Sequence, residues 1–225
     1  LGSDPIYQYY SGIGDASQGV LTLEPVYTGA GGGGGVRKWI DWFLPAMAES
    51  ESLTFNYVQA GQENSFGWKS MKKGLTMQMP VFRNLTDEAA FRVETLSESG
   101  HWFKENFPVT PVSSVTVSDD FLNAGKSAVW YDSRYYRAGL YWSGTEFIIR
   151  DIHMFDEKIE SDYLRKPLTT TYCEYITPPF VDGFFWSSEK ELAGLRLVTL
   201  KADGTTEIIP VRSHECEESS ADVLS

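Results

Sequence analysis

The sequence is poor in the residues that build disulfide frameworks and metal-dependent active sites. Only two cysteines, Cys173 and Cys216, and three histidines occur among 225 residues. Two cysteines do not make a disulfide framework or a metal site; they either form one bridge, as in a secreted protein, or are unrelated thiols. The spacings H-E-x-x-H and G-x-S-x-G, and paired Cys and His, are missing, which argues against metal catalysis through His or Cys.

Clusters of positive charge and long apolar runs are missing as well. The net charge is −12, and the densest basic group is Lys69, Lys72 and Lys73. Because phosphate binding needs clustered Lys and Arg, we expect no nucleic acid partner. No apolar run reaches the length of a membrane span, so we expect no membrane insertion. We interpret Leu1-Gly2-Ser3 as the remnant of a removed fusion tag.

Aromatic and β-branched residues are abundant and favour strands. Aromatic residues make up 14% of the chain. Short strand-like runs predict strands at 20–27, 52–59, 74–82, 113–118, 127–132, 138–143, 146–155, 170–176, 182–188, 194–201 and 206–212. The last two runs flank Asp203-Gly204, residues that tolerate a positive φ, and this pattern predicts a β-hairpin.

Few segments favour helices. Residues 85–100 have a capping Thr86, acidic residues in the first turn and a terminal Gly100, so we expect a helix there. Residues 36–45 fit a helix or a strand, and Pro45 argues against a long helix. The glycine-rich run 28–37 lacks the context of a phosphate-binding loop, and we expect a mobile connector.

Many short strands with few helices predict an all-β fold. We expect an antiparallel, jelly-roll-like β-sandwich with one or two short helices. Residues 4–215 would form one sandwich domain, with any seam near 158–167. Residues 216–225 would form an acidic C-terminal tail.

The stretch 128–142 combines aromatic rings with charged side chains on predicted strands. A core face rarely holds Asp and Arg unless they are paired, whereas sugars stack on rings and bond to charged groups. The alternative is that the rings are core and that Asp132 pairs with an arginine at the rim. The candidate ligand-binding residues are Trp130, Asp132, Arg134, Tyr136, Arg137 and Trp142.

Residues 145–158 carry an apolar strand followed by acidic residues. The matching positions are Ile149, Asp151, Ile152, Phe155 and Asp156. This pattern resembles the closing strand of jelly-roll modules in carbohydrate-active proteins. The resemblance implies a module beside a glycan-processing enzyme, or such an enzyme itself, and such modules often hold structural calcium. Asp119-Asp120 and Asp156-Glu157 offer oxygen ligands, but no loop has a calcium signature, so we expect no cofactor.

Three functions fit these observations. We expect a non-catalytic glycan-binding module, extracellular or at the cell surface, that binds a polysaccharide or oligosaccharide. The second hypothesis is a polysaccharide lyase or glycoside hydrolase of sandwich fold. The conceivable lyase residues are Arg134, Tyr135, Tyr136, Arg137 and His153. The third is a structural or receptor-binding protein, such as an adhesin or a virion component.

Overall fold

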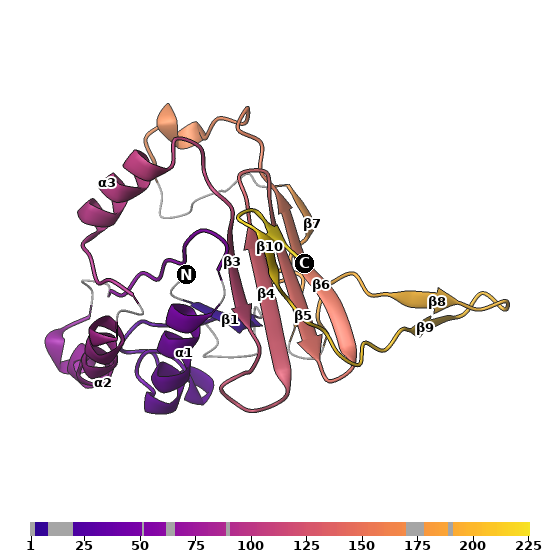
Figure 1. Ribbon diagram of the computed structural model, residues 1–225, viewed down its shortest axis with the longest axis horizontal. Coiled ribbons are helices and arrows are strands. Elements are labelled where there is room, and N and C mark those ends of the chain that lie inside the picture. Colours follow the sequence, from indigo (N-terminus) through magenta and orange to yellow (C-terminus); the bar gives the residue numbers. More distant parts are fainter. Residues whose placement is uncertain are drawn as a thin grey trace.

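The computed structural model describes residues 3–8, 20–50, 52–61, 66–88, 91–169, 178–188 and 191–225. Its centre is an antiparallel sheet of five strands in the order β3-β4-β5-β6-β7 (Figure 1). Its strands are β3 (Ser113–Val117), β4 (Lys126–Asp132), β5 (Tyr136–Ser143), β6 (Glu146–Met154) and β7 (Pro179–Val181). Neighbours in sequence are neighbours in space, so the sheet is a meander with short connections.

Within the described residues, three two-stranded sheets accompany the central one. They pair β1 (Ser3–Gln8) with β2 (Val20–Thr22), β8 (Val198–Leu200) with β9 (Thr206–Ile208), and β10 (Glu218–Ser220) with β11 (Val223–Leu224). The β8–β9 hairpin projects away from the body as an arm (Figure 1). Gly204 at its tip has a φ of 83°, which confirms the turn predicted at Asp203-Gly204.

The described residues contain three α-helices, more than the one or two short helices expected. They are α1 (Arg37–Glu49), α2 (Trp68–Asp87) and α3 (Leu96–Asn106), and short 3-10 turns occur at Gly29–Gly31 and Asp162–Leu164. The prediction of one helix over residues 85–100 is wrong. Helix α2 ends at Asp87, and α3 begins only at Leu96. The capping residue is Thr95, which forms a capping box with Glu98.

Helix α2 replaces the strand expected over 74–82. Alternating apolar residues there suggested a strand, but the side chains that α2 buries follow a helical stripe. That stripe consists of Met71, Gly74, Gln78 and Leu85. Because two of these four residues are not hydrophobic, hydrophobic periodicity alone does not reveal the stripe. Helix α1 likewise continues past Pro45 and buries its apolar face.

The glycine run is a packed turn, so the expectation of a mobile connector is wrong. Gly32, Gly33, Gly34 and Gly35 are all buried. Gly34 N–H donates to the carbonyl of Thr22, and the Gln78 amide donates to the carbonyl of Gly34. A Cβ on Gly34 would lie 2.2 Å from the carbonyl oxygen of Leu23, so the close approach requires glycine.

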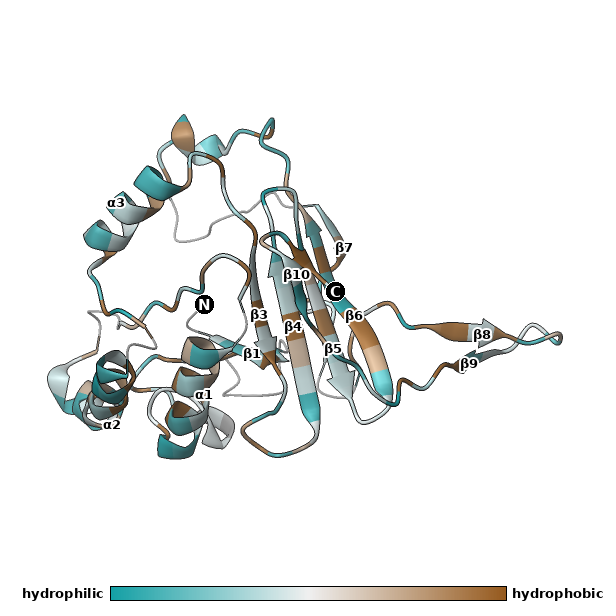
Figure 2. Cartoon of the chain, viewed as in Figure 1, coloured by the Kyte–Doolittle hydropathy of each residue, from teal (hydrophilic) through white to brown (hydrophobic). Residues whose placement is uncertain are grey.

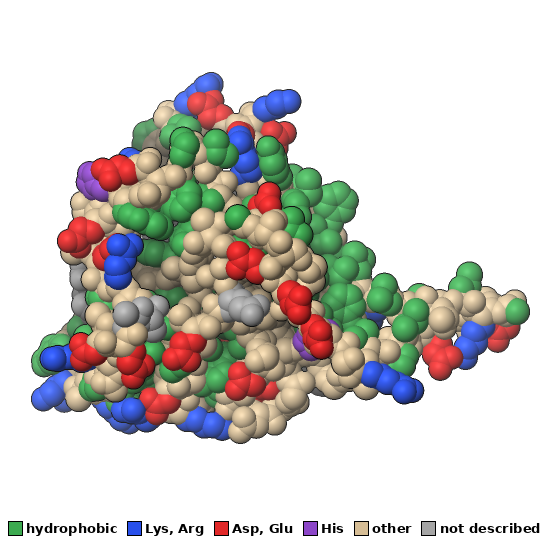
Figure 3. Space-filling view, in the orientation of Figure 1, with side chains coloured by type: hydrophobic (Ala, Val, Ile, Leu, Met, Phe, Trp, Pro, Cys, Tyr) green, Lys and Arg blue, Asp and Glu red, His purple; other side chains and the backbone are tan. Residues whose placement is uncertain are grey.

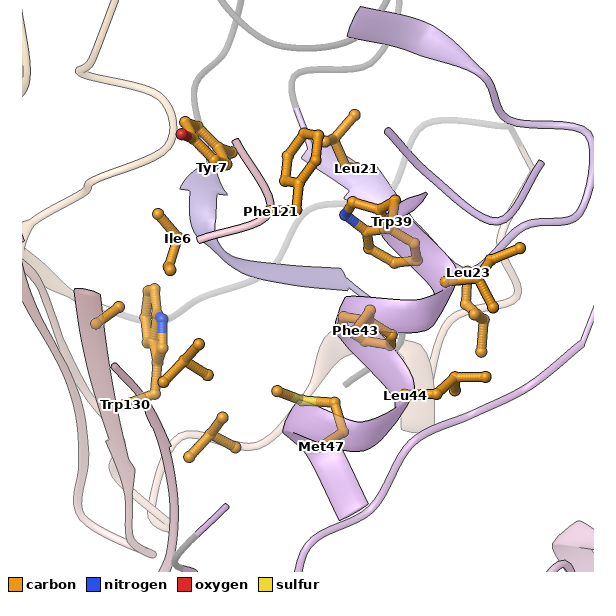
Figure 4. Packing of buried hydrophobic residues seen from close by; sticks show 14 of the residues in the cluster. Ile6, Tyr7, Leu21, Leu23, Trp39, Phe43, Leu44, Met47, Phe121 and Trp130 are labelled. Carbon is orange, nitrogen blue, oxygen red and sulfur yellow. The ribbon is translucent and has the colours of Figure 1, made fainter. Parts of the chain in front are cut away.

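The main core lies between one face of the sheet and α1 with β1 and β2 (Figure 4). The sheet contributes Val115, Val117, Ala128, Trp130, Tyr141 and Ile148. Trp39 and Phe43 of α1 stack at 4.3 Å between ring centroids. We call this side of the sheet the inner face. On the opposite, outer face, the Tyr131 hydroxyl donates to the carbonyl of Asp222, which follows β10.

A β-bulge in β6 sends an arginine into the core. Gly139 pairs with Asp151 and Leu140 pairs with Ile149, so Arg150 is the extra residue. Its side chain is buried and donates to the carbonyls of Pro5 and Ile6. The bulge therefore ties β1 to the centre of the sheet.

Antiparallel strands dominate the fold, as expected, and the strands predicted over 113–155 are confirmed. Residues 52–59 and 182–188, expected as strands, form loops and turns. The predicted strand 170–176 lies outside the described residues, as does Cys173. The described strands supply one large sheet and do not by themselves form the second sheet of a sandwich.

Candidate functional site

The β4–β5 hairpin divides the six predicted ligand residues between the two faces of the sheet. Asp132 pairs with Arg137, and both point to the inner face together with Trp130. Trp142 pairs with Ser127 and points to the outer face, as does Tyr136. The hairpin turn at Ser133 separates these sets, and Arg134 lies on the turn. The six residues therefore do not form one surface.

Trp130 belongs to the core. Its side chain is 5% exposed, and its indole N–H donates to the carbonyl of Pro5 at 2.7 Å. The guanidinium groups of Arg150 and Arg137 lie 5.4 and 5.7 Å from its ring. No face of this ring is open to a ligand in the structure, so we do not include Trp130 in the binding surface.

The β4–β5 turn presents the most open aromatic rings of this region. Tyr135 is 59% exposed and Tyr136 is 39% exposed. Tyr136 stacks on Tyr131 with 5.4 Å between ring centroids. Arg134 donates two hydrogen bonds to the Glu157 carboxylate, at 3.0 and 2.5 Å, and its guanidinium lies 5.2 Å from the Tyr135 ring. We call Arg134, Tyr135, Tyr136 and Glu157 the turn surface.

Trp142 lies at the other end of β5, away from the turn. The His214 imidazole stacks on its ring at 4.0 Å, and the Phe147 ring lies at 5.1 Å. The hydroxyl of Ser127 lies 3.2 Å from Nε2 of His214. One side of the Trp142 ring is thus covered by the C-terminal segment of the same chain.

Five charged or titratable side chains meet on the inner face near the turn. They are Asp132, Arg137, Asp151, His153 and Asp182, which we call the polar cluster. Arg137 lies opposite His153 across β5 and β6, and its Nε donates to Oδ1 of Asp151 at 2.8 Å. His153 Nε2 lies 3.6 Å from Oδ2 of Asp151 and 3.6 Å from Oδ2 of Asp182. Asp151, His153 and Asp182 are buried.

Asp182 and Asp132 complete the polar cluster. Asp182 follows β7, and its Oδ1 accepts from the backbone N–H groups of Phe184 and Phe185 at 3.0 and 2.8 Å. Burial raises the pKa of Asp132, while the charge of Arg137 lowers it and the charge of Asp151 raises it further. A buried carboxyl group whose pKa is raised near an arginine and a second carboxylate is a common feature of binding and catalytic sites.

Sequence reasoning missed the polar cluster as a unit. It considered Arg137 and His153 as lyase residues and quoted Asp151 only for the resemblance. The register of β5 and β6 determines the cluster. The bulge at Arg150 shifts this register, so that Asp151 and His153 face inward together with Arg137. No pattern in the sequence predicts that bulge. Asp182 joins the cluster because β7, which it follows, pairs with β6.

Three of the four acidic residues considered for calcium, Asp120, Asp156 and Glu157, have other partners. Asp120 accepts from the Tyr7 hydroxyl and from the backbone N–H groups of Leu122, Ala124 and Lys126. Burial raises the pKa of Asp120, but these hydrogen bonds outweigh it and hold the pKa below its usual range. Glu157 pairs with Arg134, and Asp156 accepts from Lys158 N–H.

Two surface hollows lie away from both the turn surface and the polar cluster. One, of about 600 Å³, is lined by α2 from Trp68 to Asn84. The other, of about 370 Å³, lies between α1 and the end of β3. The first has one charged residue in its lining, Arg83, and the second has the carboxylates of Asp41, Glu49 and Asp119 but no histidine or arginine.

No protein-family model matches the chain, and the searches of curated proteins and of solved structures found no match either. Among the described residues, no helix is both long enough and apolar enough to cross a bilayer.

Proposed function

We propose that the chain is a glycan-binding module of a carbohydrate-active protein, working outside the cell or at its surface and binding a polysaccharide or oligosaccharide without cleaving it. The observation that carries the proposal is the turn surface. It places the exposed ring of Tyr135 and the half-exposed ring of Tyr136 beside a bidentate Arg134–Glu157 pair. Rings supply flat apolar contact, and the charged pair supplies donors and acceptors for hydroxyl groups.

The resemblance of residues 145–158 to jelly-roll modules supports the same class of protein. A jelly-roll sandwich, in which a second sheet would face β3–β7, is part of the proposal. Of the six candidate ligand-binding residues predicted from the sequence, we assign binding to Arg134 and Tyr136. Tyr135, which was not among the six, is added. Asp132 and Arg137 lie at the same end of the sheet and would contact a ligand that extends around the hairpin.

Titration of the chain with a panel of polysaccharides and oligosaccharides, followed by calorimetry, tests the proposal. We expect Tyr135→Ala and Tyr136→Ala each to weaken binding about tenfold, because each removes a ring contact. The matched control is Trp68→Ala, since Trp68 is 60% exposed on α2 and remote from the turn. This control should leave binding unchanged.

The same mixtures are assayed for new reducing ends and unsaturated products. Product formation that is lost in His153→Gln or Arg137→Gln would replace the proposal with a lyase or hydrolase that uses the polar cluster. Failure to bind any glycan would overturn both readings and favour a structural or receptor-binding protein.

A further inference from the structure

The polar cluster contains three ligand atoms that converge on one point. Asp151, His153 and Asp182 each offer one ligand atom, and these three atoms lie within 4.8 Å of one another. They come from neighbouring positions on β6 and from the turn after β7, so the central sheet fixes two of the three. Carboxylate oxygens and an imidazole nitrogen are the usual ligands of divalent transition metals.

The separation of these atoms suits a shared metal better than a direct hydrogen bond. Each Asp oxygen lies 3.6 Å from His153 Nε2. A charged hydrogen bond would bring such atoms to about 2.7–2.9 Å. Two ligands at about 2.1 Å from a tetrahedral ion stand about 3.4 Å apart. The two distances from His153 Nε2 therefore lie within a few tenths of an ångström of those that a shared ion requires.

The other carboxylate oxygens are held by groups that orient them. Oδ1 of Asp151 accepts from Arg137 Nε, and Oδ1 of Asp182 accepts from the backbone N–H groups after it. These bonds direct each Oδ2 toward His153, in the way that outer partners orient metal ligands. Oδ2 of Asp151 also accepts from Gly183 N–H at 3.3 Å, which positions the turn that carries Asp182.

The net negative charge of the polar cluster also favours a bound cation. The polar cluster holds three carboxyl groups (Asp132, Asp151 and Asp182) and one guanidinium, which pairs with Asp151. When all three are ionised, two negative charges remain in a largely buried region, where unbalanced charge is costly. A divalent cation balances them. Calcium prefers all-oxygen cages of six to eight ligands, so the imidazole indicates a transition metal.

We propose that Asp151, His153 and Asp182 bind one divalent transition metal ion, such as Zn²⁺ or Mn²⁺. Three protein ligands leave a coordination position for water or a ligand atom, as in catalytic zinc sites. Arg137, which donates to Oδ1 of Asp151, has a side chain that is 36% exposed. The site lies on the inner face and does not depend on the proposed glycan binding, which can be measured in chelator.

The test is metal analysis of the purified chain after chelator treatment and titration with Zn²⁺, Mn²⁺, Co²⁺, Mg²⁺ and Ca²⁺. We expect one equivalent of a transition metal and a melting temperature that rises with the free metal concentration. His153→Gln and Asp182→Asn should weaken binding at least tenfold. His214→Gln, at a histidine outside the cluster, is the matched control and should bind as the parent chain does.

The visible absorption of bound Co²⁺ provides a readout on the unmodified chain, so the test stands even if a variant fails to fold. Absorption typical of tetrahedral nitrogen and oxygen ligands supports the site. No stoichiometric binding of any tested transition metal would overturn the proposal, as would unchanged affinity in a folded His153→Gln chain.

Discussion

Arg150 and Asp4 are buried charges that connect β1 to the rest of the molecule. The Arg150 guanidinium donates to the carbonyls of Pro5 and Ile6 and lies 4.9 Å from the Tyr141 ring. Asp4 accepts from the backbone N–H groups of Ile6 and Tyr7 and from the Trp39 indole. Burying a charge is tolerated only where hydrogen bonds replace water, and both groups meet that condition.

Asp4 should make the free energy of unfolding depend on pH. Burial raises its pKa from 3.8 to about 6, against the hydrogen bonds from Tyr7, Trp39 and Ile6. Because the folded state holds the proton more tightly, this contribution is greatest below pH 4 and is lost as pH rises to about 6. The loss amounts to about 3 kcal/mol.

Urea denaturation of the parent chain and of Asp4→Asn between pH 3 and pH 7 measures this effect. The difference in unfolding free energy between the two chains should shift by about 3 kcal/mol across that window, in favour of Asp4→Asn as pH rises. A difference that is the same at every pH would contradict the assignment.

At the level of elements, contact with the carbonyl of Pro25 determines where α2 packs. A Cβ on Gly74 would lie 2.1 Å from that oxygen, so Gly74→Ala must push the helix away. We expect a loss of about 1–3 kcal/mol of stability, although alanine favours helices by about 1 kcal/mol.

Gly100→Ala in α3 is the control for Gly74→Ala. A Cβ at Gly100 meets nothing within 4 Å, so this change should be neutral or stabilising by up to about 1 kcal/mol. Thermal or urea unfolding of both variants distinguishes packing from helix propensity. Equal effects of the two substitutions would show that the Pro25 contact is unimportant.

The sequence correctly predicted the strands in which alternating apolar residues match the buried face. It also predicted the hairpin with an Asp-Gly turn. These are β3 to β6 and the β8–β9 arm. It failed for α2, whose buried stripe contains Gly74 and Gln78, and for the glycine run, which is buried where backbone packs on backbone. It found Asp132, Arg137 and His153 individually. Their assembly into the polar cluster depends on strand register, which local patterns do not determine.

The whole molecule consists of a packed body and an arm that contributes little to the core. Every residue of β8 and β9 is exposed, and Leu200 is 75% exposed. Figure 2 shows the apolar character of β8, and Figure 3 shows apolar side chains along the arm and the adjoining flank of the body. Exposed apolar side chains on a projecting hairpin favour contact with another surface.

Replacing residues 198–208 with an Asn-Gly turn should leave the body folded. We expect the melting temperature to change by less than about 4 °C, because the arm buries little apolar surface. Self-association at high concentration should fall, since exposed apolar residues are removed. Circular dichroism and size-exclusion chromatography measure the two effects. Loss of cooperative melting would show that the arm is part of the folding unit.

The contact between Arg150 and β1 also bears on how the chain is made. Arg150 is separated from Ile6 by 144 residues. At synthesis rates of about 5–20 residues per second, Ile6 leaves the ribosome roughly 7–30 s before Arg150 does. During that interval the carbonyls of Pro5 and Ile6 have no guanidinium to bind, and the apolar side chains of β1 have no sheet to cover them. Strand β1 therefore forms its contact with Arg150 only late in synthesis, and until then its apolar side chains are open to chaperones and proteases.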